Sequence, residues 1–391
     1  MTAWKIPLYK VFWDKEDLEA VAKVIRRGTF WAVGPEIEEF EKATAEYIDR
    51  KHAVAFNSGT SALHALMLAC NIDDNAKVIV PSFTFIATAN APLFAGATPV
   101  FADIELDTFA LNAEKVSKML DNKVKAIMPI HYGGVPCRDI QLLRDLADQH
   151  KMLLLEDAAE SIGSTINNVK VGSFGDAAMF SFCGNKIITT GEGGIVVTDS
   201  GAIYERLKLA RSHGRLESEP YFLTVKTLDY IELGYNWRMP TMIAALGISQ
   251  LKKLEKVITL RQEKADYYSK NLRKVKWIKV PDPYNNFKHV YQMYTIRISL
   301  GKKVRDDLRD FLAKKGIMTK VYFEPVHLTH FYKEKFGYKK GELPITERLS
   351  DEVLTLPLYP TLKREEMDYV IDCIMEFAAK IKNEEASHIS D

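Results

Sequence analysis

The sequence predicts an α/β protein, with a mostly parallel sheet flanked by helices and a smaller C-terminal α+β domain after it. Three observations support this fold class. Segments that read as strand, turn and helix repeat from residue 53 to residue 156. Their apolar stretches are continuous rather than alternating, which is typical of strands covered on both faces. The chain has 391 residues, enough for two domains. We expect a large α/β domain with N-terminal helices over residues 1–255 and a small α+β domain over residues 256–391.

The individual elements follow from local patterns. Apolar residues recur at helical spacing over 14–26, where Gly28 ends the helix, and again over 36–48. Short apolar runs between turns predict buried strands at 53–56, 77–81, 99–102, 126–130, 152–156, 178–182 and 195–197. Helices are predicted at 62–70, 87–94, 139–150 and 241–257. The small domain is expected to contain a strand at 293–298 and helices at 304–315 and 365–382.

The composition argues against several classes of partner. Lys and Arg total 53 and Asp and Glu total 52, so nothing in the net charge of +1 attracts nucleic acid or an anionic membrane. No apolar run has the length of a membrane span, and the first residues lack the apolar region of a secretory signal. The cysteines are scattered without a C-x-x-C pair, which favours a reduced, cytoplasmic protein without a metal centre; they are Cys70, Cys137, Cys183 and Cys373.

One lysine is notable for its position. Lys186 follows the apolar strand 178–182 and precedes the strand 195–197, in a loop of small and polar residues that includes Gly191-Glu192-Gly193-Gly194. Lysines usually lie on solvated faces, so a lysine between two buried strands is expected to lie in a pocket. Loss of hydration lowers the pKa of the ammonium, and the neutral amine is a nucleophile. We therefore predict that Lys186 forms a Schiff base with pyridoxal 5'-phosphate (PLP).

Asp157 is the candidate partner of the cofactor ring. It follows the buried strand 152–156, and open α/β sheets bind ligands at the carboxyl ends of their strands. A carboxylate there can keep a pyridine nitrogen protonated, which makes the ring an electron sink. The alternative is a helix N-cap, which would be preferred for Asp157 alone. Because Lys186 lies one βαβ-sized unit further along the chain, we favour the cofactor role.

Phosphate and ring contacts are predicted near two other strand ends. The turn Ser58-Gly59-Thr60-Ser61 offers N–H groups and hydroxyls at a helix N-terminus, which suits a phosphate, although ordinary capping explains the same residues. Ser181 is a second candidate donor, or else a serine at a sheet edge. Phe85, just beyond the strand 77–81, could stack on a planar cofactor or belong to the core.

Other kinds of site find little support. His131, His213 and His327 lie in loops and are as compatible with structural roles as with functional ones. No H-E-x-x-H or Cys/His cluster suggests a metal. A glycine-rich dinucleotide fingerprint is absent after the first strand, which disfavours an NAD-dependent sugar enzyme.

In combination, these motifs resemble the DegT/DnrJ/EryC1/StrS family of sugar aminotransferases. The likeness extends over nearly the whole chain, from Gly34-Pro35 to Leu356-Pro357-Leu358. The matching motifs are Asn57-Ser58-Gly59-Thr60-Ser61-Ala62-Leu63, Pro81-Ser82-Phe83-Thr84-Phe85, Glu156-Asp157-Ala158-Ala159-Glu160-Ser161, Ser181-Phe182 with Asn185-Lys186 and Gly191-Glu192-Gly193-Gly194, Gly234-Tyr235-Asn236-Trp237-Arg238-Met239, and Phe323-Glu324-Pro325-Val326-His327-Leu328.

The resemblance implies a fold-type I, aspartate aminotransferase-like enzyme that uses PLP and forms pyridoxamine 5'-phosphate during turnover. It also implies a homodimer with both active sites at the subunit interface. Lys186 matches the Schiff-base lysine, and Asp157 matches the partner of the pyridine nitrogen. The other matched positions are Phe85 for stacking on the ring, Gly59, Thr60 and Ser181 for the phosphate, Asn236 for the phosphate of the neighbouring subunit, and Glu160 near the ring and the product amine.

The resemblance further implies amino transfer from L-glutamate to C4 of a nucleotide-linked 4-keto-6-deoxyhexose, for surface polysaccharide, glycan or antibiotic biosynthesis. Amination at C3 of a 3-keto sugar nucleotide remains open, as does, less favoured, a non-catalytic regulatory protein of the same fold. The diphosphate of the substrate calls for basic or donor groups, and Arg238 and His327 are the candidates. Their alternatives are a structural ion pair and a capped loop.

Overall fold

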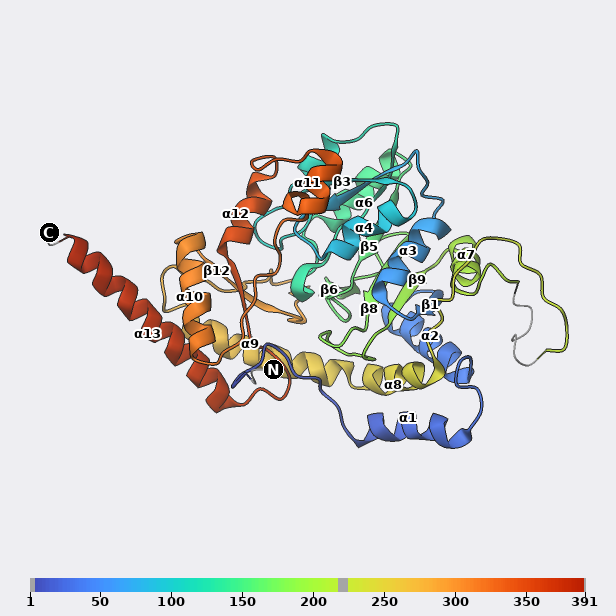
Figure 1. Cartoon of the computed structure of the whole chain (residues 1–391), viewed down its shortest axis with the longest axis horizontal. Helices are drawn as coiled ribbons and strands as arrows, with labels where there is room; N and C mark the ends of the chain where they lie inside the picture. Colours follow the sequence, from blue (N-terminus) through green and yellow to red (C-terminus); the bar gives the residue numbers. More distant parts are fainter. Residues whose placement is uncertain (1–3, 217–223, 390–391) are drawn as a thin grey trace.

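The computed structural model describes residues 4–216 and 224–389, with side chains up to residue 382. Its largest feature is a seven-stranded sheet in the order β1-β9-β8-β5-β4-β2-β3 (Figure 1). The strands are β1 (His52–Phe56), β2 (Lys77–Pro81), β3 (Thr98–Ala102), β4 (Val124–Ile127), β5 (Leu153–Asp157), β8 (Ala177–Ser181) and β9 (Gly194–Thr198). Each lies within a few residues of a strand predicted from the sequence.

The sheet is mostly parallel, as predicted, but one strand is reversed. β2 pairs in parallel with β3 and β4, β4 pairs with β5, and β5 pairs with β8. β9 runs antiparallel to both of its neighbours, β1 and β8. The reversal follows from the connection, because β8 and β9 are joined by the lysine loop (residues 182–193) and not by a crossover helix. Ser181 at the end of β8 is therefore paired with Gly194 at the start of β9.

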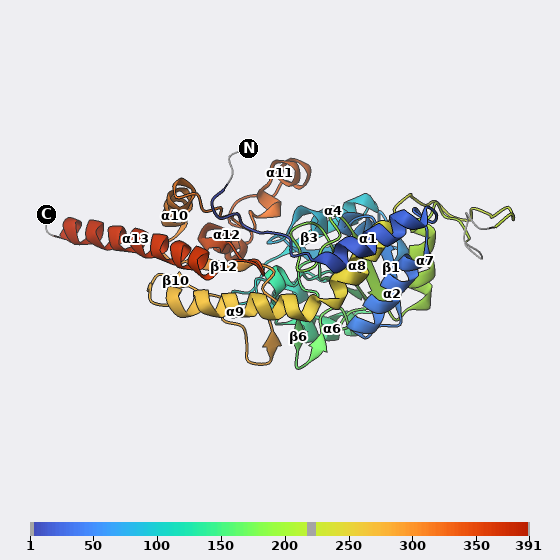
Figure 2. The ribbon, with the colours of Figure 1, turned by 90° about the horizontal axis from the view of Figure 1, so that it is seen from below.

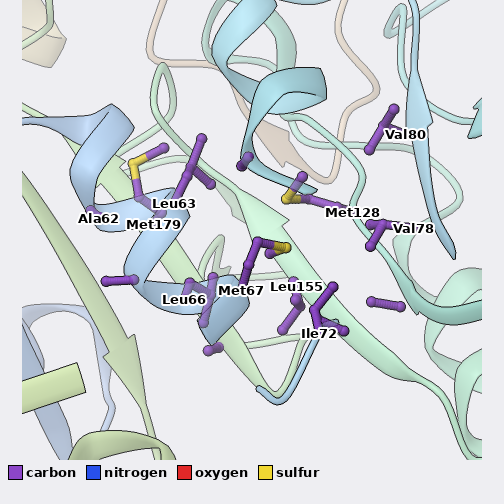
Figure 3. Close-up of a cluster of buried hydrophobic side chains, with 14 of the residues drawn as sticks. Ala62, Leu63, Leu66, Met67, Ile72, Val78, Val80, Met128, Leu155 and Met179 are labelled. Atoms are coloured by element: carbon purple, nitrogen blue, oxygen red, sulfur yellow. The ribbon is translucent and has the colours of Figure 1, made fainter. Parts of the chain in front are cut away.

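Helices cover both faces of the sheet, so alternate strand residues enter different cores. On one face, α3 (Gly59–Ala69), α4 (Ile86–Phe94) and α7 (Gly201–Arg211) pack on residues such as Val78, Val80 and Met179 (Figure 3). On the other face, α2 (Pro35–Ile48) and α8 (Thr241–Lys252) cover β1, β8 and β9. Two further helices, α5 (Ala113–Ser117) and α6 (Ile140–Gln149), cover β2, β4 and β5 on the same side. Outside this layer, α1 (Lys15–Arg27) packs along α8 (Figure 2).

A second core lies in the part of the chain predicted as the small domain. Its antiparallel sheet has the order β10-β12-β13, formed by β10 (Ile278–Lys279), β12 (Tyr294–Ile298) and β13 (Val353–Leu356). α10 (Lys302–Lys314) and α13 (Arg364–Ile389) pack on it, and α13 projects away from the body in Figure 1. The N-terminal segment also reaches this core, where Ile6 is buried and pairs with Ile317.

The remaining elements are short. β6 (Thr165–Ile166), β7 (Val169–Lys170) and β11 (Phe287–Lys288) form a third sheet. Two helices, α11 (His330–Phe336) and α12 (Pro344–Glu352), and two 3-10 turns, Tyr132–Gly134 and Val326–Leu328, complete the fold. Within the described residues, we find no helix with the length and apolar character to cross a bilayer.

A long helix, α9 (Leu254–Leu272), connects the two cores. Its first turns bury Val257 and Ile258 in the large core, and its second half buries Tyr268 and Leu272 in the small one. The helix predicted over 241–257 is therefore two helices, α8 and α9, that meet at Lys253. The division between residues 255 and 256 falls within α9. This domain boundary remains a prediction, because α9 belongs to both cores and no linker separates them there.

Candidate active site

The lysine loop places Lys186 at the carboxyl end of the parallel strands. Phe182 donates its N–H to the Gly193 carbonyl, which closes the loop at its base, and Lys186 donates its N–H to the Cys183 carbonyl. The Lys186 side chain is only 13% exposed, and Nζ lies 3.5 Å from Oε1 of Glu160, which is equally buried. The expected lysine in a pocket is therefore present.

Glu160 is held by a turn that follows a different strand. The 3-10 turn Tyr132–Gly134 comes after β4, and Gly133 has a positive φ of 58° in it. The Gly133 N–H donates to Oε2 of Glu160 at 2.9 Å, which leaves Oε1 facing Lys186. A carboxylate and an amine, each on a largely buried side chain, thus lie opposite each other.

Asp157 ends β5 and is electrostatically coupled to Lys186. Its Oδ2 accepts from Thr88 Oγ1 at 2.6 Å, and its Oδ1 accepts from the Ala159 N–H at 3.1 Å. Burial raises the pKa of Asp157, and the bond from Thr88 opposes that shift. The segment after Asp157 forms turns rather than a helix, so the N-cap alternative is wrong. Because burial disfavours the ionised carboxylate, a cationic partner such as a protonated ring nitrogen would compensate its charge.

The N-terminus of α3 lies against the end of β8. Ser58 caps the helix by accepting from the Ser61 N–H, while helix geometry leaves the N–H groups of Gly59 and Thr60 without intrahelical acceptors. A Cβ added to Gly59 would lie 3.1 Å from Cβ and 3.2 Å from Oγ of Ser181. Amides and hydroxyls from two strand ends therefore surround one small space, an arrangement that fits a phosphate.

Phe85 directly precedes α4 and is 60% exposed, which rules out the core alternative. Thr88, which bonds Asp157, lies in the first turn of the same helix. The ring centroids of Phe85 and Phe323 are 6.5 Å apart. An exposed aromatic ring beside the pocket is available to stack on a planar cofactor.

Asn236 and Arg238 lie in a segment that runs beside the end of β1, where the Asn57 N–H donates to the Trp237 carbonyl at 2.8 Å. Asn236 is exposed and forms a backbone bridge with Ser212. Arg238 forms a backbone bridge with Phe56, and its side chain lines a cavity of about 660 Å³ between α2 and α7. The lining of that cavity does not include Lys186. The predicted roles of Asn236 at the phosphate and of Arg238 at the substrate remain predictions.

His327 has an interior position that corrects its predicted role as a substrate contact. The ring is fully buried, Nδ1 is hydrogen-bonded with Ser82 Oγ at 2.7 Å, and Nε2 faces Glu347 Oε1 at 3.4 Å. Burial lowers its pKa, which favours the neutral ring. With both nitrogens bonded inside the protein, His327 has the structural role that the sequence left as the alternative.

The pocket as a whole supplies what PLP requires: an amine, a buried carboxylate for the ring nitrogen, an aromatic face, and a phosphate cradle in which Gly59 lies close against Ser181. Residues 12–375 match the DegT/DnrJ/EryC1/StrS aminotransferase family. The chain belongs to this family. It is a PLP-dependent sugar aminotransferase, as the sequence predicted.

Individual relatives cover the chain almost completely. GDP-perosamine synthase from Escherichia coli O157:H7 is 36% identical over 372 residues, which are 95% of this chain and 98% of that protein. PseC from Helicobacter pylori, an aminotransferase involved in the biosynthesis of pseudoaminic acid, has a similar structure, with a TM-score of 0.89 and 29% identity over 96% of this chain and 99% of its own. A sugar aminotransferase from Streptococcus pneumoniae, solved in its PLP form, aligns with a TM-score of 0.88 and 25% identity over 96% of this chain and 99% of its own.

Substitution of Gly59 by alanine should weaken PLP binding by roughly tenfold, because the new Cβ would displace Ser181 from the phosphate cradle. Equilibrium dialysis with PLP measures the dissociation constant. Gly201→Ala is the matched control, since Gly201 also begins a helix after a serine cap and a Cβ there meets nothing within 4 Å. Equal affinities for the two variants would contradict the assignment of the cradle.

Sequence reasoning missed the roles of two residues, Thr88 and Glu156. Thr88 gave no signal in the sequence, because it lies inside the helix predicted at 87–94 and its partner Asp157 is 69 positions away. Glu156 was visible as a charged residue at the end of an apolar strand. Its Oε2 accepts from His131 Nε2 at 3.0 Å and the Gly172 N–H at 2.8 Å. Its Oε1 accepts from the N–H groups of Phe174 at 2.9 Å and Gly175 at 2.7 Å. Glu156 therefore fixes the strand end that carries Asp157.

Glu156→Gln should destabilise the protein by about 2–4 kcal/mol, because an amide nitrogen would then face N–H donors in a fully buried site. Burial alone would raise the pKa of Glu156, but the bonds from His131 and the backbone outweigh it and hold the pKa below 4.5. This carboxylate therefore stabilises the fold above pH 4.5, and the difference from the variant shrinks as the pH falls below that value. Urea unfolding at several pH values measures this difference in the free energy of unfolding. Glu205→Gln is the control, because Glu205 is exposed. Equal stability of the two variants would contradict the structural role of Glu156.

Proposed function

We propose that the enzyme transfers the amino group of L-glutamate to C4 of a nucleotide-linked 4-keto-6-deoxyhexose, making an amino sugar for a polysaccharide or glycan. The opposed pair Lys186 and Glu160, beside Asp157 and the N-terminus of α3, supports transamination. The similarity to a GDP-perosamine synthase over 95% of the chain supports the sugar. Perosamine is a 4-amino-4,6-dideoxymannose, so GDP-linked 4-keto-6-deoxymannose is the substrate expected first.

Lys186 is the residue that moves protons in this proposal. Its Nζ takes the α-proton from L-glutamate as a general base and later delivers a proton to C4 of the sugar as a general acid. Glu160, whose Oε1 faces Nζ at 3.5 Å, stabilises the protonated amine between these steps. The overall change releases one 2-oxoglutarate for each amine placed on the sugar.

The other residues hold and tune the cofactor. When bound, PLP supplies an electron sink for the negative charge that develops at the reacting carbon. Asp157 would keep the ring nitrogen protonated, and Phe85 would cover one face of the ring. Gly59, Thr60 and Ser181 would hold the phosphate at the α3 N-terminus. These residues come from β8, the lysine loop and the segments that follow β1, β2 and β5.

Product identification tests the substrate. The enzyme is incubated with L-glutamate and a panel of GDP-, UDP- and dTDP-linked 4-keto and 3-keto sugars, and products are identified by mass spectrometry and NMR. We expect 2-oxoglutarate together with an amine at C4, formed fastest from the GDP-linked sugar. Amination only at C3 would contradict the proposed position. PLP binding without turnover of any sugar would favour a regulatory protein of the same fold.

We also propose a homodimer in which Asn236 of each chain reaches the phosphate site of the other. Large apolar side chains are exposed on and around α1, where Trp13 and Leu18 are both 65% exposed. Others lie just before Asn236, where Leu233 is 80% exposed. Exposed large apolar side chains are typical of an interface, and the nearness of Leu233 to the exposed Asn236 in the sequence supports a shared site.

A mixing experiment tests this arrangement. Lys186→Ala and Asn236→Asp variants are each expected to be inactive, but a hybrid dimer contains one site with both defects and one site with none. Statistical mixing should therefore restore about a quarter of the wild-type activity. Activity that stays at the level of the separate variants, although light scattering shows dimers that exchange subunits, would contradict a site shared between chains.

The reaction is proposed to take place in the cytoplasm. Cys137 and Cys373 are buried free thiols. Buried unpaired cysteines are usual in a reducing compartment.

A further inference from the structure

Two buried threonines connect α4 to the carboxylate of Asp157. Thr84, Thr88 and Asp157 are 3%, 1% and 6% exposed, so water does not compete for their hydroxyls and carboxylate. Thr84 Oγ1 lies 2.7 Å from Thr88 Oγ1, which in turn lies 2.6 Å from Oδ2 of Asp157. Neither threonine takes part in the proposed reaction.

The direction of these bonds follows from counting protons. A hydroxyl has a single proton to donate, and an ionised carboxylate only accepts. Thr88 therefore donates to Asp157, and Thr84 must donate to Thr88. Both dipoles point toward the carboxylate, and chained hydrogen bonds in a buried site strengthen one another.

The hydrogen-bond chain opposes the effect of burial on the protonation of Asp157. Burial favours the protonated form of Asp157, whereas hydrogen bonds donated to the carboxylate favour the ionised form. The charged groups that act on Asp157 besides these donors are Lys186, which also favours the ionised form, and Glu160, which opposes it. With the Ala159 N–H on Oδ1 and Thr88 on Oδ2, the plane of the carboxylate is fixed from both sides.

We propose that Thr84 and Thr88 form a directed hydrogen-bond chain that keeps Asp157 ionised and oriented toward the ring nitrogen of PLP. Thr88 is thus a positioning residue for the cofactor, and Thr84 supports it. This inference rests on the role of Asp157 in the proposed function. Because Phe85 is the N-cap of α4 and Thr88 lies in its first turn, the start of this helix would position both the ring face and the ring nitrogen.

The test uses three variants of the PLP-loaded enzyme. Thr88→Val keeps the shape and removes the hydroxyl, Thr88→Ser keeps the hydroxyl, and Thr84→Val cuts the chain one step further away. The readouts are the dissociation constant of PLP and the ¹⁵N NMR shift of the ring nitrogen in ¹⁵N-labelled PLP. We expect Thr88→Val to weaken PLP binding about tenfold and to move the ¹⁵N signal toward the unprotonated ring, with recovery in Thr88→Ser. Thr84→Val should have a smaller effect, about two- to threefold.

A double-mutant cycle with Asp157→Asn separates positioning from a general structural role. If Thr88 acts through Asp157, Thr88→Val has no further effect on PLP affinity in the Asp157→Asn background. An equal loss in both backgrounds, or a protonated ring signal in Thr88→Val, would overturn the proposal. If Thr88→Val does not fold, the test rests on Thr84→Val. An unchanged PLP affinity and an unchanged ¹⁵N shift in that variant would overturn the proposal. If Asp157→Asn itself leaves the ring signal unchanged, the assignment of Asp157 fails instead.

Discussion

Replacement of Lys186 by alanine should abolish transamination, with a loss on the order of 10³-fold or more in kcat/KM. Its Nζ is the amine that faces Glu160 at 3.5 Å in the pocket, and alanine can neither bond the cofactor nor move a proton. The fold should persist, because the Lys186 backbone bond to Cys183 does not involve the side chain. Release of 2-oxoglutarate from L-glutamate measures the effect.

Two further variants make this prediction specific. Lys186→Arg keeps a positive charge opposite Glu160 but is not a nucleophile, so it should be as inactive as the alanine variant. Lys118→Ala removes a lysine that is 64% exposed and pairs only with Glu114 four residues before it, and it should retain full activity. If Lys186→Ala turns over within about tenfold of the wild type, Lys186 is not the base.

Asp157→Asn should lower kcat/KM by roughly 10²- to 10³-fold, because a neutral amide cannot hold a ring nitrogen protonated. The side chain keeps its shape, and its oxygen can still accept from the Ala159 N–H. Asp145→Asn is the control, because it removes the same charge from an exposed position on α6, where Asp145 accepts from Gln141. Equal kcat/KM values for the two variants would contradict the role of Asp157.

The same substitution should stabilise the protein when PLP has been removed. Burial raises the pKa of Asp157 above 3.8, so the folded state favours its protonated form. The contribution of this group to stability is therefore present below pH 3.8 and is lost as the pH rises through the raised pKa. At neutral pH, the PLP-free Asp157→Asn variant should unfold at a higher temperature than the PLP-free wild type. A lower unfolding temperature would show that the carboxylate is already compensated without the cofactor.

Local patterns predicted most of the large domain correctly. β2 is predicted by its uninterrupted apolar run. α1 is predicted by its apolar spacing together with the Asp14 cap and the Gly28 stop. In both cases the residues that define the element are close together in the sequence. The direction of β9 is not contained in its own apolar run, which has the same composition in either orientation; it follows from the lysine loop, which contains no crossover helix. The break at Lys253 was also missed, since apolar spacing continues across it. Strands of two residues, such as β10, are too short for any periodicity.

Prediction of the candidate site from the sequence had the same limits. Motifs placed Lys186, Asp157 and Gly59 at strand ends, and parallel strands end at one edge of a sheet, so their proximity followed from the fold class. The bond between Thr88 and Asp157 joins residues 69 positions apart, and no local pattern indicates it. His327 was predicted to contact substrate because of its motif. Its burial depends on Ser82, 245 positions away in the sequence.

The sequence by itself determined the fold class, the family and the residue types of the cofactor pocket, because each is expressed in contiguous motifs or in a repeating pattern. Tertiary structure decided which side chains meet: Glu160 with Lys186, Thr88 with Asp157, and His327 with the interior. Those contacts depend on how separate strands and helices pack, since burial and hydrogen-bond partners arise only when distant segments come together. The lysine between two strands was visible in the chain, but the carboxylate that faces its amine became visible only in the folded protein.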